Sequence, residues 1–180
     1  VDHPDGLEFV CAKNEEGSLV NFNISVGVVG GFMQAVARES DFALVHPHTG
    51  HVARTLPAGE IFDAIVESAW KNGEPGLVFL DVINARNPTP ALGEIQATNP
   101  CGEAPLLPYE ACVLGSVNLA HVLKGEAPDC AIDWDRLERL VRLGVRFLDD
   151  VITVTRYPLP QVARMTRGNR KIGLGVMGFA

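Results

Sequence analysis

The residues best suited to chemistry lie in the stretch ATNPCGE, residues 97–103. Here a thiol, Cys101, stands two residues after the amide of Asn99 and two residues before the carboxyl group of Glu103. A carboxylate can take a hydroxyl proton, an amide can hold the same substrate by two kinds of hydrogen bond, and a thiol can give up a proton or a hydrogen atom. The trio therefore suits sugar chemistry as well as acyl chemistry.

The backbone that presents these side chains is predicted to be a loop, because Pro100 and Gly102 are unfavourable inside a helix. In a locally extended backbone, alternate side chains point the same way, so one face would carry the thiol, the amide and the carboxyl group. The alternative is a proline-glycine turn with a buried cysteine that behaves as a small hydrophobe. The spacing alone leaves both interpretations open.

A second cysteine, Cys112, follows in the run YEACVLG, and the two remaining cysteines are Cys11 and Cys130. No C-x-x-C pair and no histidine at ligand spacing accompanies them, so neither a zinc site nor a structural disulfide framework is expected. The histidines of the run HPHTGH, residues 46–51, are assigned to an exposed turn, because no carboxylate or cysteine ligand is near. We therefore expect no metal.

The elements before the loop follow the alternation of helix and buried strand that is typical of a parallel α/β sheet or barrel. The helix that starts at Pro57 has an apolar face predicted to contain Ile61, Phe62, Ile65, Val66, Ala69 and Trp70. The apolar run LVFL, residues 77–80, then predicts a strand buried on both faces. Upstream, the patterns predict a helix entry at 2–5, a strand at 22–28, a helix at 31–38 and a hairpin at 42–56.

The elements after the loop are two predicted strands, residues 113–119 and 171–178, and a long helix between them. Asp133 is predicted to cap this helix, which ends near Val151. Its buried stripe is assigned to Trp134, Leu137, Leu140, Val141, Val145 and Leu148. Residues 81–96 are interpreted as irregular, 157–160 as a rigid break, and 164–170 as a basic surface turn.

The run NPCGEAPLLPYEACVLGSVNL resembles the active-site region of ribonucleotide reductase large chains, and most of all the adenosylcobalamin-dependent, class II form. Other stretches agree in order along the chain, namely HPDGLEFVCAK, NFNISVGV, NGEPGLVFLD, ARNPTP, DWDRLERLVRLGVRFLDDVI, YPLP and NRKIGLGVMGF. The resemblance thus covers nearly all of the 180 residues. It implies a segment of a ten-stranded α/β barrel from a ribonucleoside-diphosphate reductase, which makes 2′-deoxyribonucleotides for DNA synthesis.

The resemblance also implies a role for each reactive side chain. Cys101 matches the residue that becomes a thiyl radical and abstracts the 3′ hydrogen of a ribonucleotide. Glu103 matches the general base on the 3′ hydroxyl, and Asn99 the amide that hydrogen-bonds the substrate. Cys112 resembles one of two cysteines that deliver electrons to the 2′ carbon and end as a disulfide; its partner lies upstream of Val1 in the family. A thioredoxin- or glutaredoxin-like reductant would reset this disulfide by thiol exchange.

The radical must come from a cofactor, because no side chain generates one unaided at neutral pH. Gly102, in place of the bulkier residue common in the iron-dependent class, favours adenosylcobalamin, although no cobalamin-binding residue is assigned. One alternative is the large chain of an iron-dependent, class I reductase, which needs a separate radical-generating subunit. An alternative of another class is a non-catalytic nucleotide-binding barrel fragment.

The resemblance further implies a nucleoside triphosphate effector and is compatible with a homodimer. It assigns residues 13–21 to the loop that links an allosteric nucleotide site to the substrate base. The alternative is a solvated connector. The residues assigned to this specificity loop are Lys13, Asn14, Glu15, Glu16, Gly17, Ser18 and Asn21.

The composition, 47% hydrophobic and 21% charged residues, is ordinary for a globular protein. A formal charge of -7 argues against a general nucleic-acid surface. No apolar run approaches the ~20 residues of a membrane span and no leader precedes Val1, so a cytoplasmic protein without membrane contact is expected. Because the chain lacks a starting methionine and stops after a glycine-rich run, residues 1–180 are predicted to be part of a single catalytic barrel domain, truncated at both ends.

Overall fold

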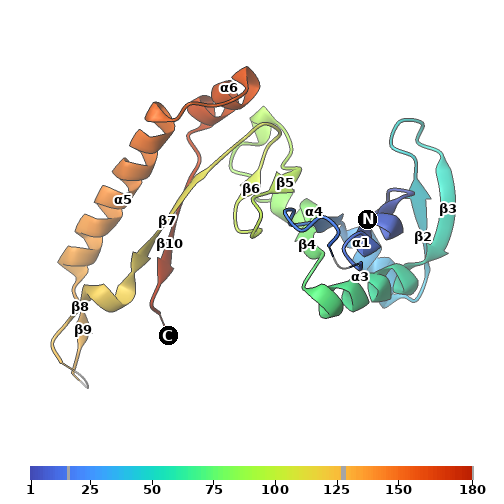
Figure 1. Cartoon of the computed structure of the whole chain (residues 1–180), viewed down its shortest axis with the longest axis horizontal. Helices are drawn as coiled ribbons and strands as arrows, with labels where there is room; N and C mark the ends of the chain where they lie inside the picture. The colour runs from blue at the N-terminus through green and yellow to red at the C-terminus, as the bar shows by residue number, and fades with distance from the viewer. Residues whose placement is uncertain (16, 127–128, 180) are drawn as a thin grey trace. The chain divides into compact units, whose positions relative to one another are not determined.

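The computed structural model describes residues 1–15, 17–126 and 129–179. The chain divides into two compact units, Val1–Pro105 and Leu106–Ala180 (Figure 1). Both units contain helices and strands, so the predicted α/β class is confirmed. Among the described residues the strands form separate two-stranded pairs, and no closed barrel is present. None of the helices in these ranges is both long and apolar enough to cross a membrane.

The sheet of the first unit is a parallel pair, β1 (Ser25–Val28) and β4 (Gly76–Phe79). A parallel pair needs a long crossover connection. This connection contains α2 (Gly30–Ala37), the antiparallel hairpin of β2 (Asp41–Val45) and β3 (Val52–Pro57), and α3 (Ala58–Asn72). The predicted order of elements is therefore confirmed, although β1 starts three residues later than the expected strand 22–28.

The core of the first unit is formed by α1 (Gly6–Cys11), α2, α3 and the strands β1 and β2. Its buried members are Val10, Val26, Val28, Phe32, Ala35, Leu44, Ala58, Ile61 and Ile65. The ring of Phe32 meets that of Phe42 edge to face, with centroids 5.2 Å apart. Because burying each large apolar side chain contributes about 1.5–3 kcal/mol, this core fixes β1, which also lines the candidate site.

Helix α3 has the predicted helical period, but its buried face contains fewer residues than predicted. Ile61 and Ile65 are buried, and Ser68 continues the same stripe. Trp70 is 87% exposed and Val66 is 50% exposed, so their predicted burial is wrong. Positions two residues apart lie about 200° apart around a helix axis. Trp70 therefore points away from the core that Ser68 faces.

The segment after α3 departs from prediction in two ways. Leu77 and Phe79 of β4 are 37% and 40% exposed, so burial on both faces is wrong. An apolar run permits burial, but burial also needs neighbours, and among the described strands only β1 pairs with β4. The predicted irregular region contains α4 (Leu80–Asn84) and a 3-10 turn, Pro90–Leu92, and is followed by the short strands β5 (Ala97–Thr98) and β6 (Pro105–Leu106).

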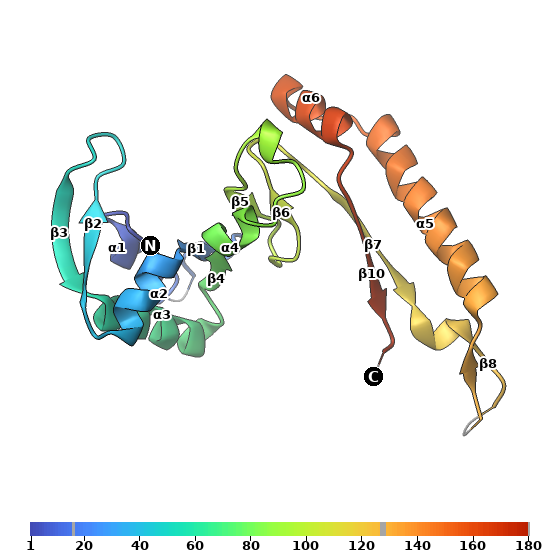
Figure 2. The same ribbon diagram turned by 180° about the vertical axis from the view of Figure 1, so that it is seen from behind.

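The second unit is built on another parallel pair, β7 (Val113–Asn118) and β10 (Ile172–Met177). The long helix α5 (Trp134–Val154) lies along both strands (Figure 2). Its predicted cap is confirmed, because Oδ1 of Asp133 accepts a hydrogen bond from the N–H of Arg136 at 3.0 Å. The other elements are α6 (Pro160–Asn169), a 3-10 turn at Leu119–Val122, and the antiparallel pair β8 (Leu123–Lys124) and β9 (Ala131–Ile132).

The side of α5 that packs on the strands includes Gly144, Leu148 and Ile152, which are four residues apart and share one helix face. Leu148 is buried as predicted, whereas Trp134, Val141 and Val145 are 67%, 39% and 41% exposed, so their predicted burial is wrong. A glycine carries no apolar signal in a sequence. Here it allows close contact, because a Cβ added at Gly144 would lie 3.2 Å from Leu174 of β10.

The predicted break is confirmed at residues 157–159, which lie between α5 and α6, whereas the predicted basic surface turn, 164–170, is wrong because α6 extends to Asn169. Pro160 stands in the first turn of this helix, where its fixed φ and missing N–H are favourable. The proline marks a helix start rather than an interruption. After Asn169, Arg170 adopts a left-handed conformation with φ 50° and leads the chain into β10.

Candidate active site

The chain reverses direction in a tight turn between β5 and β6. The N–H of Gly102 donates to the carbonyl oxygen of Asn99 at 3.0 Å, which places Pro100 and Cys101 at the centre of the turn. Gly102 has φ +88°, a conformation that residues with side chains rarely adopt. The expectation of an extended backbone is therefore wrong, and the proline-glycine turn is present. Its cysteine is not buried, however, because Cys101 is exposed.

Asn99 closes this turn with its side chain as well as its backbone. Its N–H donates to the carbonyl oxygen of Ala104 at 3.1 Å, and its Oδ1 accepts from the N–H of Ala104 at 2.9 Å. No partner for its side-chain nitrogen occurs in the part of the chain that the structure describes. The amide can therefore hold the turn through its oxygen and donate to a substrate through its nitrogen.

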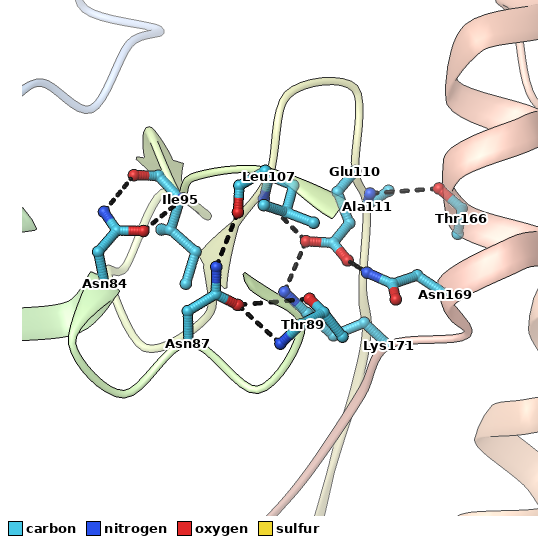
Figure 3. Close-up of polar contacts among 11 residues, drawn as sticks. Asn84, Asn87, Thr89, Ile95, Leu107, Glu110, Ala111, Thr166, Asn169 and Lys171 are labelled. Carbon is cyan, nitrogen blue, oxygen red and sulfur yellow. Dashed lines mark hydrogen bonds and ion pairs between the residues drawn. The ribbon is translucent and has the colours of Figure 1, made fainter. Parts of the chain in front are cut away.

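Two asparagines position the segment that leads into the turn (Figure 3). Asn84 of α4 donates to the carbonyl oxygen of Ile95 at 2.9 Å and accepts from its N–H at 2.8 Å, as a neighbouring strand would. Asn87 donates to the carbonyl oxygen of Gly93 at 2.9 Å. The sequence interpretation missed both residues; the only signal for them is the asparagine content of residues 81–96.

Cys101 opens on a cavity of about 470 Å³, which the turn forms with β1, β4 and α4. A second cavity of about 310 Å³ is lined by Asn99 and shares four lining residues with the first, Asn23, Ser25, Val78 and Pro100. Ligand pockets usually measure about 300–1,000 Å³. The thiol and the amide thus face two neighbouring spaces that are large enough for parts of a nucleotide or cofactor.

The first cavity has an apolar wall beside the thiol. Leu77 and Phe79 of β4 and Val82 of α4 line it and are 37%, 40% and 57% exposed. Exposed apolar surface of this kind often marks a binding site. The wall fits a large ligand with an apolar face, and such a ligand would keep water away from Cys101.

The structure brings two of the four predicted catalytic residues, Cys101 and Asn99, to cavities that share a wall. Glu103 lies two residues beyond the thiol, is exposed, and lines neither cavity. Cys112 belongs to the second unit, where it is half-buried immediately before β7. The catalytic roles of all four residues stay predictions.

The predicted specificity loop is linked to the first cavity by an ion pair. Lys13 pairs with Glu74, a residue that lines this cavity. Asn14 donates to Oγ of Ser68 at 3.2 Å and so joins the loop to α3. The start of the loop is therefore held on the first unit, while Glu16 lies outside the described residues. The specificity role of the loop stays a prediction.

The exposed histidines of the predicted turn, His46, His48 and His51, lie in and beside the connection between β2 and β3. In residues 1–15, 17–126 and 129–179, no three or more His, Cys, Asp or Glu side chains are placed to hold a metal ion.

The family model "Ribonucleotide reductase, barrel domain" matches residues 1–180. Over its whole length the chain is 56% identical to the vitamin B12-dependent ribonucleoside-diphosphate reductase of Mycobacterium tuberculosis (strain CDC 1551 / Oshkosh), of which it covers 26%. The protein of the same name from Thermoplasma acidophilum is 49% identical over 99% of the chain, which covers 23% of that protein. A putative ribonucleoside-diphosphate reductase large subunit of Frog virus 3 is 36% identical over the whole chain and is 33% covered. The chain thus spans about a quarter to a third of these relatives.

Proposed function

Because the chain belongs to the barrel-domain family of ribonucleotide reductases, we propose that it forms part of a catalytic barrel that reduces ribonucleotides to 2′-deoxyribonucleotides. The observation that carries the proposal is the exposed thiol of Cys101 on a tight turn that faces a cavity. The names of the relatives support a ribonucleoside-diphosphate reductase. Residues 1–180 would then be one segment of a single ten-stranded barrel domain in a longer protein.

In this proposal Cys101, as a thiyl radical, takes the 3′ hydrogen of the ribose. Glu103 accepts the proton of the 3′ hydroxyl as general base, a task that needs a carboxylate within hydrogen-bond reach. Asn99 donates an N–H of its side chain to a ribose oxygen, while its own oxygen remains bonded to Ala104. Closure of the site by substrate and cofactor would shield the radical from solvent.

Cys112 supplies one of the two thiols that reduce the 2′ carbon, and the second thiol lies elsewhere in the parent protein. Together the two thiols lose two electrons and two protons and form a disulfide. The substrate loses its 2′ hydroxyl as water and gains a hydrogen at the same carbon. A dithiol reductant of the thioredoxin or glutaredoxin type then returns the disulfide to two thiols by exchange.

The proposed cofactor is adenosylcobalamin, in line with the vitamin B12 dependence named for the relatives. When bound, it would supply the radical chemistry that removes the hydrogen atom of the Cys101 thiol and leaves the thiyl radical. Leu77, Phe79 and Val82 would contact part of the cofactor in the cavity that Cys101 lines. The same wall would exclude water from the reacting sulfur.

The loop at residues 13–21 is proposed to carry the signal of a nucleoside triphosphate effector. The ion pair between Lys13 and Glu74 supports this, because it links the loop to the cavity that Cys101 faces. An effector that moved the loop would therefore alter the wall of the substrate site. A homodimer would be the assembly in which such regulation acts.

The test uses the full-length parent protein with a ribonucleoside diphosphate and a dithiol, with and without adenosylcobalamin. The proposal predicts deoxyribonucleotide only with the cofactor, no product from Cys101→Ser, and normal turnover by Cys130→Ser, which changes an exposed cysteine outside the site. Turnover that instead requires an iron-containing partner would assign the iron-dependent class. No turnover under either condition would favour the alternative of a non-catalytic nucleotide-binding barrel fragment.

A further inference from the structure

A completely buried carboxylate, that of Glu110, lies two residues before Cys112. Its Oε2 accepts from the N–H of Leu107 at 2.8 Å and lies 2.5 Å from Nζ of Lys171 (Figure 3). Its other oxygen accepts from the side-chain amide of Asn169. Both oxygens are bonded and a cation balances the charge, as a buried carboxylate requires.

The neighbouring residue is held as well. The N–H of Ala111 donates to Oγ1 of Thr166 at 3.2 Å, and Thr166 is only 1% exposed. The segment is therefore bonded to α6 through Ala111 and to the start of β10 through Glu110. Cys112 is the first residue after this doubly held segment.

The strand register brings Cys112 next to Lys171. Val113 pairs with Ile172 in the parallel ladder of β7 and β10. One position earlier on each chain stand Cys112 and Lys171. Because neighbouring strands lie about 4.8 Å apart, the backbones of Cys112 and Lys171 are neighbours just before this ladder.

The other charged side chains on α5 and α6 near this segment have different surroundings. Arg170 binds Asp149 at 2.6 Å, Arg167 donates to the carbonyl oxygen of Thr155 at 3.3 Å, and Arg164 is exposed. Glu110, two residues before Cys112, and Lys171, its neighbour in register, form the ion pair beside this segment.

We propose that Glu110 is a positioning residue for Cys112, which with Lys171 fixes the start of β7 and balances the local charge so that the cysteine remains a protonated thiol. The inference rests on the proposed function, in which Cys112 gives up a proton together with an electron. A thiolate has no hydrogen to give. A nearby cation favours the thiolate and a nearby anion favours the thiol. Lys171 alone would therefore favour loss of the proton that the reaction needs, and Glu110 offsets this effect.

The test measures how the alkylation rate of Cys112 by iodoacetamide depends on pH in the full-length parent protein. Mass spectrometry of the peptide that contains Cys112 separates it from the other cysteines. Glu110→Gln removes a negative charge and should lower the midpoint of the profile by about one pH unit. Lys171→Gln removes a positive charge and should raise it by a similar amount, while the double variant should return to the wild-type midpoint.

Glu138→Gln is the matched control, because Glu138 forms an exposed pair with Arg142 on α5 and should not move the profile. Midpoints that move in the same direction in both single variants, or in neither, would overturn the inference. A purely structural role would alter access to the thiol without opposite shifts. If Glu110→Gln does not fold, Lys171→Gln is compared with Lys171→Arg. Lys171→Gln should shift the midpoint and Lys171→Arg should not, since arginine keeps the charge.

Alkylation requires no turnover, so the two proposals can fail separately. Opposite shifts in a parent protein that reduces no ribonucleotide would support the charge balance and refute the redox role assigned to Cys112. An active parent protein without these shifts would refute only the role of Glu110.

Discussion

Asn99 shows how a single side chain can both build and serve a site. Its oxygen is already bonded to the N–H of Ala104, and this bond holds the turn that exposes Cys101. The residue types and their spacing predict which chemical groups are present. They do not predict that the oxygen of Asn99 holds the turn while its nitrogen is left to donate to a ligand. A hydrogen bond to a backbone five residues away depends on the turn, and the sequence is equally compatible with an extended chain.

Two substitutions at Asn99 should separate the two tasks. Asn99→Asp keeps an acceptor for Ala104 but removes the side-chain N–H donors, so the fold should persist while kcat/KM falls. Losing one hydrogen bond to a substrate oxygen should lower kcat/KM about tenfold or more. Asn99→Ala should show the same loss and also lower the free energy of unfolding by about 1–3 kcal/mol.

The comparison requires steady-state assays and denaturant titrations of the full-length parent protein. Wild-type kcat/KM in Asn99→Asp would show that the amide nitrogen does not touch the substrate. Full stability in Asn99→Ala would show that its oxygen does not hold the turn.

At the scale of elements, the sequence predicts the positions of periodic helices and strands well, but it predicts poorly which of their residues are buried. The order of β1, α3, β7 and α5 is correct because each has a clear period or cap. Trp70 and the exposed strand β4 are wrong because burial depends on which neighbour covers a face. The contact of Gly144 with β10 is not predicted, because a glycine adds no apolar side chain to the helical pattern.

The helix α4 matters because Asn84 substitutes for a strand partner of Ile95. Asn84→Ala should leave the N–H and carbonyl of Ile95 unpaired and lower the free energy of unfolding by about 1–3 kcal/mol. Turnover should fall too, although Asn84 lines neither cavity. Urea titration and activity assays test this beside Gln34→Ala, which changes an exposed side chain of α2 outside the site. Equal stability of the two variants would contradict the account.

The junction of α5, α6 and β10 should be sensitive to acid. A hydrogen bond from Arg170 lowers the pKa of Asp149 below its ordinary value of 3.8. Because the folded pKa is the lower one, the pair contributes stability above pH 3.8, and this contribution is lost as the pH falls through the folded value.

Asp149→Asn should remove this part of the acid sensitivity. Circular dichroism of the wild type and variant between neutral pH and pH 2 would record it, with the two stabilities converging at the acid end. A constant difference in stability at every pH would contradict the role of the charge.

At the scale of the whole molecule, apolar strand surface remains exposed in both units. Leu77 and Phe79 of β4 are 37% and 40% exposed, and Val176 and Met177 of β10 are 62% and 55% exposed. Each strand is hydrogen-bonded to a single neighbour among the described residues. The remaining strands of a ten-stranded barrel would pair with these edges and cover Val176 and Met177, while Leu77 and Phe79 would still line the cavity that Cys101 faces.

Residues 1–180 expressed alone should therefore aggregate, because unpaired edges and apolar faces are sites of association. Light scattering after size-exclusion chromatography would measure this, with the full-length parent protein as the control. A soluble monomer with a cooperative unfolding transition would show that the two units bury enough surface without the remainder of a barrel.

In the proposed function Cys101, as a thiyl radical, removes the 3′ hydrogen of a ribonucleotide. The most direct measurement is reduction of a ribonucleoside diphosphate carrying deuterium at the 3′ carbon, in competition with the unlabelled substrate, by the full-length parent protein. The account predicts discrimination against the deuterated substrate in the wild type and in Cys130→Ser, and no product from Cys101→Ser. Reduction by Cys101→Ser, or equal use of both substrates, would contradict it.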